Sequence, residues 1–359
     1  MIDKWYKPYL GIDPELFVKD KKGNIVGGEI VVEKEVKIVY SESKITLDGI
    51  ALELNPEAQM CRQSMNSKIS HLLDTLKHLV AKKDLLFDFN VTNPIREEEM
   101  EVVSKQNRQF GCKPTYNAQE TFKSKIRDAS KYLFRSGGGH IHVGKFSAIQ
   151  EAFTDKKETD KLIKLMDIIV GNTFVLIDRD KGNIERRKNY GRAGEFRISP
   201  SKVEYRVLSN YWLRSPYLAS FATGLVREAV IVYANGNTDE FLNAVDMEDI
   251  KNAINNNDFD LAMENFNRII DLLVFHPEMH NNIPLMSSDK DNFLEFVADN
   301  IKKDKFPVKT EKDVRKILRE WTGTSDPYHK GWENFLRMKE WKKIRTTPHI
   351  TDTINLNFY

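Results

Sequence analysis

Two stretches near the start of the chain carry acidic residues among apolar ones. In residues 46–56 the alternation of apolar and polar residues predicts a strand on which Glu53 points away from the apolar face. Residues 10–18 form a second extended segment followed by a turn signal, and Asp13 and Glu15 share one of its faces. Each acidic face lies either in solvent or in a cleft, and the pattern leaves both interpretations open.

Longer stretches carry apolar residues at helical spacing. Residues 65–87 and 159–177 each show an apolar stripe with charged residues elsewhere around the wheel, which predicts amphipathic helices covering a sheet. A third helix is predicted from Pro216 to the Asn-Gly stop at 235–236. Beyond it the signal is weaker, and the chain shows helical segments near 238–254, 258–275, 290–302 and 310–321.

Composition describes an ordinary globular protein without a strong charge bias. Of the 359 residues, 40% are hydrophobic and 30% are charged, and the net charge is +2, so no global field favours nucleic acid or an anionic membrane. Two cysteines are too few for a disulfide framework. The first residues lack the order of a signal peptide, and no apolar run reaches the roughly 18 residues of a membrane span. We therefore expect a cytoplasmic protein without membrane contact.

Residues 137–144, Gly-Gly-Gly-His-Ile-His-Val-Gly, are the most site-like stretch. Read as a strand, they place His140 and His142 on one face and apolar residues on the other. Gly138 and Gly139 remove side-chain bulk, so that a phosphate group or a metal ion can approach the backbone. The alternative is a buried strand end with two hydrogen-bonded histidines.

A dense run of arginines follows, and Arg187, Arg192 and Arg197 belong to it. The planar guanidinium fork suits bidentate binding of phosphate or carboxylate, with a solvated loop as the alternative. The next strand places Glu204 and Arg206 on one face. This pair is either a simple ion pair or a metal ligand beside a phosphate-binding arginine.

Together, the polar strands form a constellation. Glu15, Glu53, Glu204 and one of the two histidines are the ligands expected for magnesium or manganese beside a nucleotide. An arginine cluster next to such a set would complete a phosphoryl-transfer site. The sequence contains neither a Walker loop nor the glycine fingerprint of dinucleotide-binding folds, so we do not expect those binding modes.

Four motifs occur in a fixed order, at residues 11–15 (Gly-Ile-Asp-Pro-Glu), 48–56 (Asp-Gly-Ile-Ala-Leu-Glu-Leu-Asn-Pro), 138–144 (Gly-Gly-His-Ile-His-Val-Gly) and 204–206 (Glu-Tyr-Arg). In this order they resemble the type 2 group of phage and bacterial carboxylate-amine ligases, or amidoligases, of the glutamine synthetase-like superfamily. The resemblance implies an α+β fold, with a curved, mainly antiparallel sheet backed by helices and a helical C-terminal region. It also implies ATP, magnesium or manganese ions, and an acyl phosphate that an amine attacks.

The resemblance assigns roles to individual residues. The metal ligands that it implies are Glu15 with Asp13 beside it, Glu53, His140 and Glu204. The residues expected in catalysis are Arg206, Arg197 and His142. The residues expected to contact ATP are Arg187, Arg192, Arg197, Arg206, Gly138 and Gly139. The gap between Asp48 and Glu53 is wider than that between the paired acids of glutamate-cysteine ligases, so Asp48 is left out of the set.

We expect a catalytic domain over residues 1–236 with a mostly helical region, 237–359, packed on it. The main hypothesis is an ATP-dependent ligase for a carboxylate and an amine, either small molecules or peptides. A phosphotransferase similar to guanidino kinases is one alternative. Another is a noncatalytic module that binds nucleic acid or a partner through the arginines and the tryptophan-rich basic tail, although packing of that tail against the body is favoured. A homo-oligomer, and the host cytoplasm if a phage encodes the chain, fit each hypothesis.

Overall fold

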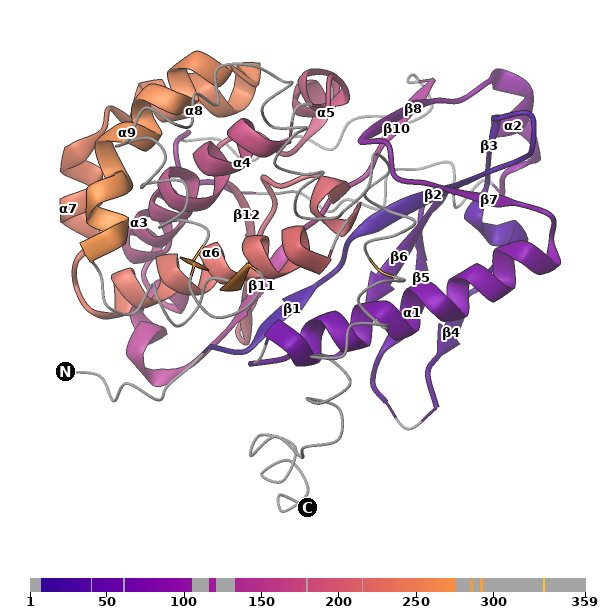
Figure 1. The fold of residues 1–359 in the computed structure, drawn as a ribbon, viewed down its shortest axis with the longest axis horizontal. Helices are drawn as coiled ribbons and strands as arrows, with labels where there is room; N and C mark the ends of the chain where they lie inside the picture. Colours follow the sequence, from indigo (N-terminus) through magenta and orange to yellow (C-terminus); the bar gives the residue numbers. More distant parts are fainter. Residues whose placement is uncertain are drawn as a thin grey trace.

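The computed structural model describes residues 8–39, 41–60, 62–104, 116–120, 133–178, 180–214, 216–275, 285–286, 291–292 and 332. In this part of the chain, antiparallel sheets lie against a set of helices (Figure 1). The predicted α+β class, with mainly antiparallel strands backed by helices, is therefore confirmed.

The first sheet contains the histidine strand. Its five strands run in the order β1 (Leu10–Ile12), β11 (Ile141–Gly144), β13 (Lys202–Tyr205), β12 (Glu195–Ile198) and β9 (Tyr116–Asn117). His142 lies opposite Gly11 on one side and Glu204 on the other, and Glu204 lies opposite Arg197. Directly opposed residues share a face of the sheet. The register therefore brings an imidazole, a carboxylate and a guanidinium into one row.

The second sheet contains the other acid-bearing strands. Its strands run in the order β3 (Ile25–Val26), β2 (Glu15–Lys19), β6 (Ala51–Asn55), β5 (Lys44–Asp48) and β4 (Glu35–Lys37), and β7 (Leu86–Asp88) also pairs with β2. Glu53 lies opposite Glu15 on one side and Thr46 on the other. Two short antiparallel pairs lie outside both sheets, β8 (Thr92–Pro94) with β10 (Phe134–Ser136) and β14 (Leu285–Met286) with β15 (Asp291–Asn292).

The two sheets meet where β1 continues into β2, because only Asp13 and Pro14 separate these strands. Pro14 has no amide hydrogen to donate, which suits a position between two ladders. On one side, the amides of Asp13 and Glu15 donate to the carbonyls of His140 and Gly138 at 3.3 and 2.9 Å. On the other side, the carbonyl of Pro14 accepts from the amide of Leu54 at 3.0 Å. The junction thus brings the three acid- and histidine-bearing strands side by side.

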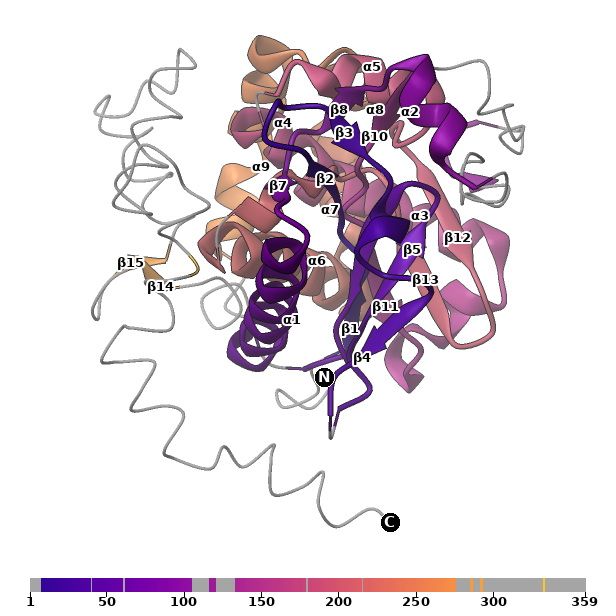
Figure 2. The same cartoon turned by 90° about the vertical axis from the view of Figure 1, so that its right-hand side faces the viewer.

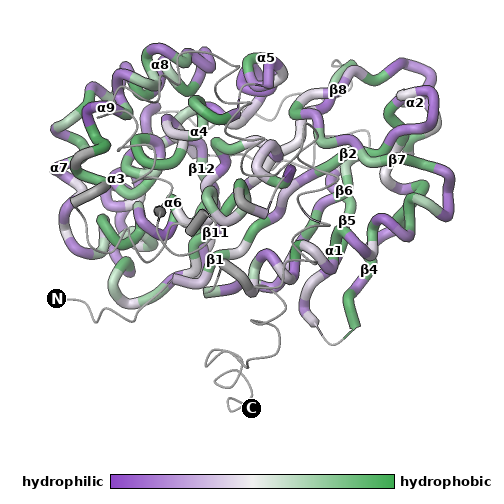
Figure 3. The backbone as a smooth tube through the Cα atoms, viewed as in Figure 1, coloured by the Kyte–Doolittle hydropathy of each residue, from purple (hydrophilic) through white to green (hydrophobic). Residues whose placement is uncertain are grey.

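Helices bury their apolar stripes against these sheets and against each other. Helix α1 (Arg62–Lys82) lies beside β5 and β7, and its residues Ile69, Leu72 and Leu76 are fully buried (Figure 2). Apolar and polar residues alternate along α1, as expected for an amphipathic helix (Figure 3). The predicted helix at 159–177 is observed as α3 (Lys156–Met166), a π-helical turn (Asp167–Gly171) and α4 (Asn172–Ile177). The predicted third helix is α6 (Pro216–Ala234).

Smaller helices complete the body. The α-helices among them are α2 (Glu97–Val102) and α5 (Gly182–Asn189). The 3₁₀ turns are η1 (Gly28–Ile30), η3 (Ser147–Phe153) and η5 (Asn210–Arg214). Helix α5 occupies part of the arginine-rich stretch, for which a solvated loop was one interpretation. The turn η5 packs under the glycines that precede β11, where Trp212 donates its indole N–H to the carbonyl of Gly139 at 3.0 Å.

After α6, three helices pack on α3 and α4, namely α7 (Thr238–Ala244), α8 (Met247–Asn256) and α9 (Phe259–Phe275). The single helix predicted near 238–254 is two helices, because Val245 is extended and Asp246 caps α8 through the amide of Glu248. The segments predicted at 290–302 and 310–321 lie outside the described residues, apart from two residues of β15.

Trp332 is the one described residue of the tryptophan-rich tail. Its ring is buried, and its indole N–H donates to the carbonyl of Leu213 at 2.8 Å. This residue therefore packs against the body, as favoured from the sequence, whereas the domain boundary at 236 stays a prediction. In the part of the chain that the structure describes, no helix is both long enough and apolar enough to cross a bilayer.

Candidate active site

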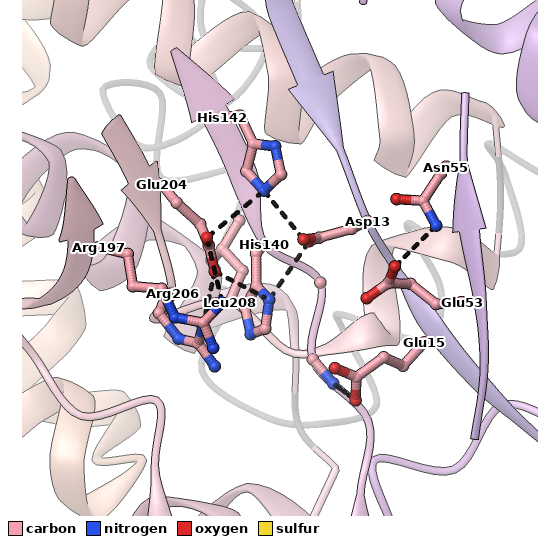
Figure 4. A network of polar contacts seen from close by, with 12 residues as sticks. Asp13, Glu15, Glu53, Asn55, His140, His142, Arg197, Glu204, Arg206 and Leu208 are labelled. Carbon is pink, nitrogen blue, oxygen red and sulfur yellow. Dashed lines mark hydrogen bonds and ion pairs between the residues drawn. The ribbon is translucent and has the colours of Figure 1, made fainter. Parts of the chain in front are cut away.

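Two groups of potential ligands meet at the junction of the sheets (Figure 4). The first, here the acidic cluster, consists of Glu15, Asp48 and Glu53. The second, here the histidine cluster, consists of Asp13, His142 and Glu204. Within each group, one potential ligand atom from every residue lies within 4.8 Å of the others. The residues come from both sheets, so the site depends on the passage from β1 to β2 through Asp13 and Pro14.

The acidic cluster concentrates negative charge on neighbouring strands. Burial, followed by the charge of Asp48, raises the pKa of Glu15 well above its usual range. Burial, followed by Asp13 and Asp48, raises the pKa of Glu53 to about 8. Burial also raises the pKa of Asp48. Carboxylates this close and this poorly solvated take up either protons or a cation.

The histidine cluster is held by two carboxylates that face both imidazoles. Nε2 of His142 lies 2.9 Å from Asp13 Oδ2 and 3.8 Å from Glu204 Oε2. Nδ1 of His140 lies 3.3 Å from Asp13 Oδ1 and 3.6 Å from Glu204 Oε1. Lys202 Nζ lies 2.9 Å from the other ring nitrogen of His142, Nδ1. Both imidazoles therefore reach the same two acids from different angles.

The surroundings of these groups shift the pKa values of the two carboxyl groups and of His140. Burial opposes ionisation of Asp13, but His142 and His140 outweigh it and hold the pKa of this carboxyl well below its usual range. Burial likewise opposes ionisation of Glu204, but His140 and Arg206 lower the pKa of Glu204. Burial, followed by the positive charge of Arg206, lowers the pKa of His140 to about 4. At neutral pH, His140 is therefore an uncharged imidazole with a lone pair to offer.

Two of the four predicted phosphate-binding arginines lie at this cluster. Nη1 of Arg206 lies 2.6 Å from Glu204 Oε1, and Nη1 of Arg197 lies 3.6 Å from Glu204 Oε2. The other two are turned toward neighbouring elements. Arg187 donates to the side-chain carbonyl of Asn257, at the end of α8, at 3.1 Å, and Arg192 donates to the backbone carbonyl of Arg187 at 2.9 Å. The structure does not bring Arg187 and Arg192 together with the carboxylates.

The glycines before β11 are explained by packing of the chain on itself. A Cβ atom on Gly138 would overlap the ring of His140, and one on Gly139 would overlap the carbonyl of Ser209 and the indole nitrogen of Trp212. The amide of Gly138 donates to Glu15 Oε2 at 2.9 Å. The space expected for a phosphate beside these two glycines is thus filled by protein atoms, and their contact with ATP stays a prediction.

Two members of the site were missed or left out of the predicted set. Asp48 shares a face of its strand with Thr46, the neighbour of Glu53, so strict alternation along 46–48 would have included it. Lys202 shares a face with Glu204 by the same rule. The structure brings Asp13, Glu15, Glu53, both histidines and Glu204 together, but the choice of His140 over His142 as ligand stays a prediction.

Comparison with known proteins bears on what this site does. Residues 126–320, more than half of the chain, match the family model of the phage phiEco32-like COOH.NH2 ligases, type 2. The chain belongs to this family. The matched part of this type 2 ligase contains His140 and the strands β11, β12 and β13, which carry His142, Arg197 and Glu204. The resemblance given by the four motifs is therefore confirmed, and the chain is a carboxylate-amine ligase by family.

Two solved structures show distant likeness to the type 2 ligase. One is apo GmaS without ligand, with a TM-score of 0.39 and 12% identity over 87% of this chain and 72% of that one. The other is the complex of the prokaryotic ubiquitin-like protein Pup with its ligase PafA, with a TM-score of 0.42 and 11% identity over 97% of this chain and 76% of that one. No curated protein matches the chain.

The crowded carboxylates predict a pH-dependent stability for the metal-free ligase. Glu53 has a pKa of about 8 in the folded chain and 4.5 as its ordinary value, so it stabilises the fold while protonated and this contribution is lost as pH rises through 8. His140 does not oppose the trend above pH 6.5, its ordinary pKa, because it is then neutral in both states. In EDTA, the Tm should therefore fall between pH 6.5 and 8.

Differential scanning calorimetry of the wild type, Glu53→Gln and Asp167→Asn separates the sources of this slope. Burial raises the pKa of Asp167 to about 7, and this residue lies away from both clusters against Tyr205 and Gln119. Both variants should show a shallower slope, but only Glu53→Gln should also lose the rise in Tm that we expect added Mg²⁺ to produce at pH 8. A wild-type Tm that is constant or rises over this interval would contradict the prediction.

Proposed function

We propose that this type 2 ligase uses ATP to activate a carboxylate as an acyl phosphate, which an amine then attacks, with magnesium or manganese ions bound at the sheet junction. The observation that carries the proposal is the position of the acidic cluster directly beside the histidine cluster, with Arg206 and Arg197 on Glu204. Metal ligands and guanidinium groups at one place are the parts that phosphoryl transfer requires.

The charges present support bound divalent cations. When ionised, the carboxylates outnumber the guanidinium groups five to two, and burial, followed by the charges of Asp13 and Asp48, raises the pKa of Glu53 to about 8. The potential ligand atoms are hard carboxylate oxygens together with imidazole nitrogens of the two histidines. A set of this kind suits magnesium or manganese. Nε2 of His140 is buried without a hydrogen-bond partner among the described residues, so it too is available as a ligand.

Each cluster has a separate part in this proposal. The residues that would hold the ions are Glu15, Asp48 and Glu53 in the acidic cluster and Asp13, His142 or His140, and Glu204 in the histidine cluster. When bound, magnesium supplies positive charge to phosphate oxygens and orients them for in-line transfer. Arg206 is almost fully buried, so its charge acts in a medium of low dielectric constant, where it stabilises developing negative charge more strongly than in water.

Activation is needed because a carboxylate is a poor acyl donor. In the first step, a carboxylate oxygen forms a bond to the γ-phosphorus of ATP, and the bond from that phosphorus to ADP breaks. In the second step, the amine nitrogen forms a bond to the acyl carbon, the carbon–oxygen bond to phosphate breaks, and the amine loses a proton. The side chains of Arg197 and Arg206 would neutralise charge on the transferred group, and their contacts with Glu204 preorganise them for this role.

A screen for ADP release tests the proposal. The purified chain is supplied with ATP and Mg²⁺ across pools of small-molecule and peptide carboxylates and amines, and products are read by mass spectrometry for the loss of one water. We expect ADP and phosphate only when a carboxylate and an amine are both present. A stable phosphorylated product without amide would instead indicate a phosphotransferase. Salt-sensitive nucleic-acid binding that persists in Glu53→Gln and Glu204→Gln, with no turnover of ATP, would indicate a noncatalytic module.

A further inference from the structure

Two neutral side chains, Thr46 and Asn55, contact Glu53 from the side away from Glu15. They belong to the β5–β6 hairpin, in which Thr46 lies directly opposite Glu53 and Asn55 follows Glu53 on the same face. Asn55 Nδ2 lies 2.7 Å from Glu53 Oε1 (Figure 4). The same nitrogen lies 2.8 Å from Thr46 Oγ1. Thr46 Oγ1 lies 3.2 Å from the same carboxylate oxygen. The three side chains therefore form a closed ring of hydrogen bonds.

When Glu53 is ionised, as cation binding requires, the chemistry of the groups fixes the direction of every bond in this ring. An ionised carboxylate only accepts, an amide nitrogen donates two hydrogens, and a hydroxyl donates one. Asn55 therefore donates one amide hydrogen to Glu53 and the other to Thr46, and the hydroxyl of Thr46 donates to Glu53. Both bonds to the carboxylate end on Oε1. Among the described residues, no donor reaches Oε2 of Glu53.

Glu15 is held in the same manner from the other strand. The amide of Gly138 donates to Glu15 Oε2 at 2.9 Å, and the hydroxyl of Tyr190 lies 3.5 Å from that same oxygen. Glu53 thus has one oxygen engaged by the protein and one left over, whereas Glu15 is engaged at Oε2 by Gly138 and also forms a side-chain hydrogen bond with Asp48. A carboxylate fixed by one oxygen cannot rotate freely, so its other oxygen is presented in a defined direction.

We propose that Thr46 and Asn55 are positioning residues that orient Glu53, through Oε1, so that Oε2 binds the divalent cation of the acidic cluster, an inference that rests on the proposed function. Neither residue contacts the cation. They act by reducing the number of conformations that Glu53 must give up on binding, and by favouring its ionised form. Outer contacts of this kind are typically worth about 10- to 100-fold in metal affinity.

Manganese binding without nucleotide tests the inference independently of catalysis. Free Mn²⁺ is measured by electron paramagnetic resonance in titrations of the wild type, Glu53→Gln, Thr46→Val, Thr46→Ser and Asn55→Leu, with circular dichroism and Tm as folding controls. Valine keeps the β-branched shape of threonine and removes only its hydroxyl. We expect Thr46→Val and Asn55→Leu to weaken, by about 10-fold or more, the site that Glu53→Gln removes. Thr46→Ser should restore affinity to within about twofold.

A double-mutant cycle shows whether Thr46 acts through Glu53. Adding Thr46→Val to Glu53→Gln should cause no further loss of Mn²⁺ affinity, because the carboxylate that it orients is already gone. Equal affinity in the wild type and Thr46→Val, or a further loss in the double variant, would overturn the inference. A chain that shows the expected Mn²⁺ pattern but releases no ADP with any substrate pair would support the positioning role and contradict the proposed ligase chemistry.

Discussion

Glu53→Gln is expected to lower amine-dependent ADP release by about 100- to 1000-fold and, at the same time, to raise the Tm of the metal-free protein at pH 8. Both effects have one physical cause. Glutamine keeps the size of the side chain and removes the charge that a divalent cation requires. The same charge lies beside Asp13 and Asp48, which together with burial raise the pKa of Glu53 to about 8. The charge of Glu53 lowers the stability of the metal-free protein, so removing this charge raises that stability.

The matched control is Glu57→Gln, the same substitution four residues along the chain. Glu57 is partly exposed and pairs with Lys68 at 2.8 Å, away from both clusters. This variant should keep wild-type turnover and change the Tm little, because exposed ion pairs contribute about 0–1 kcal/mol. Activity is measured by coupled ADP release and stability by calorimetry in EDTA. Wild-type turnover in Glu53→Gln would remove Glu53 from the cation site, whereas equal losses in both variants would point to a general effect of charge on the chain.

The faces of the strands could be predicted from the sequence, since the period of two is a local property. It placed Glu53 away from the apolar face, and it placed Glu204 on the same face as Arg206. In the structure, Leu52 and Leu54 are buried on the opposite side, and Arg206 lies 2.6 Å from Glu204. The long apolar stripes likewise gave the positions of the main helices, because their burial is repeated over many turns. The helix predicted over residues 65–87 ends at Lys82, however, and residues 86–87 belong to β7.

Register and the joining of the two sheets could not be predicted in this way. That His142 lies opposite Glu204 depends on a pairing between strands more than fifty residues apart, for which a single sequence carries no local signal. The passage between the two sheets at Asp13 and Pro14, which places Asp13 and Glu15 in neighbouring clusters, was visible only as an unusual proline between two acids.

The arginine run shows where residue type alone misleads. Arg186 resembles its neighbours in sequence, but it is fully buried and donates to the backbone carbonyls of Arg206, Val207 and Leu208, at 2.8 to 3.0 Å. It therefore fixes the chain beyond β13 instead of facing the clusters. A guanidinium fork suits carbonyl groups as well as phosphates, so only the surrounding structure separates the two uses.

Gly139→Ala is expected to destabilise the protein by about 3 kcal/mol, a fall in Tm of roughly 5 °C. The added methyl group would overlap the carbonyl of Ser209 and the indole nitrogen of Trp212, and neither can give way easily. The amide of Gly139 donates to the carbonyl of Leu208 at 3.0 Å, while its own carbonyl accepts from Trp212. Backbone held on both sides has no room to relax, so the strain remains in the fold.

The same substitution decides between the two roles considered for this glycine. If Gly139 serves to let a phosphate approach the backbone, Gly139→Ala should raise the KM for ATP and leave the Tm of the nucleotide-free protein unchanged. If it serves to pack β11 on η5, the Tm should fall before any nucleotide is added. The control is Gly144→Ala at the other end of β11, where the nearest atom to the new methyl, the carbonyl oxygen of Tyr9, is 3.3 Å away and about 1 kcal/mol or less is expected. Because β11 carries His142 of the histidine cluster, a shift of this strand should also weaken Mn²⁺ binding. Unchanged Tm and unchanged Mn²⁺ affinity in Gly139→Ala would contradict the packing role.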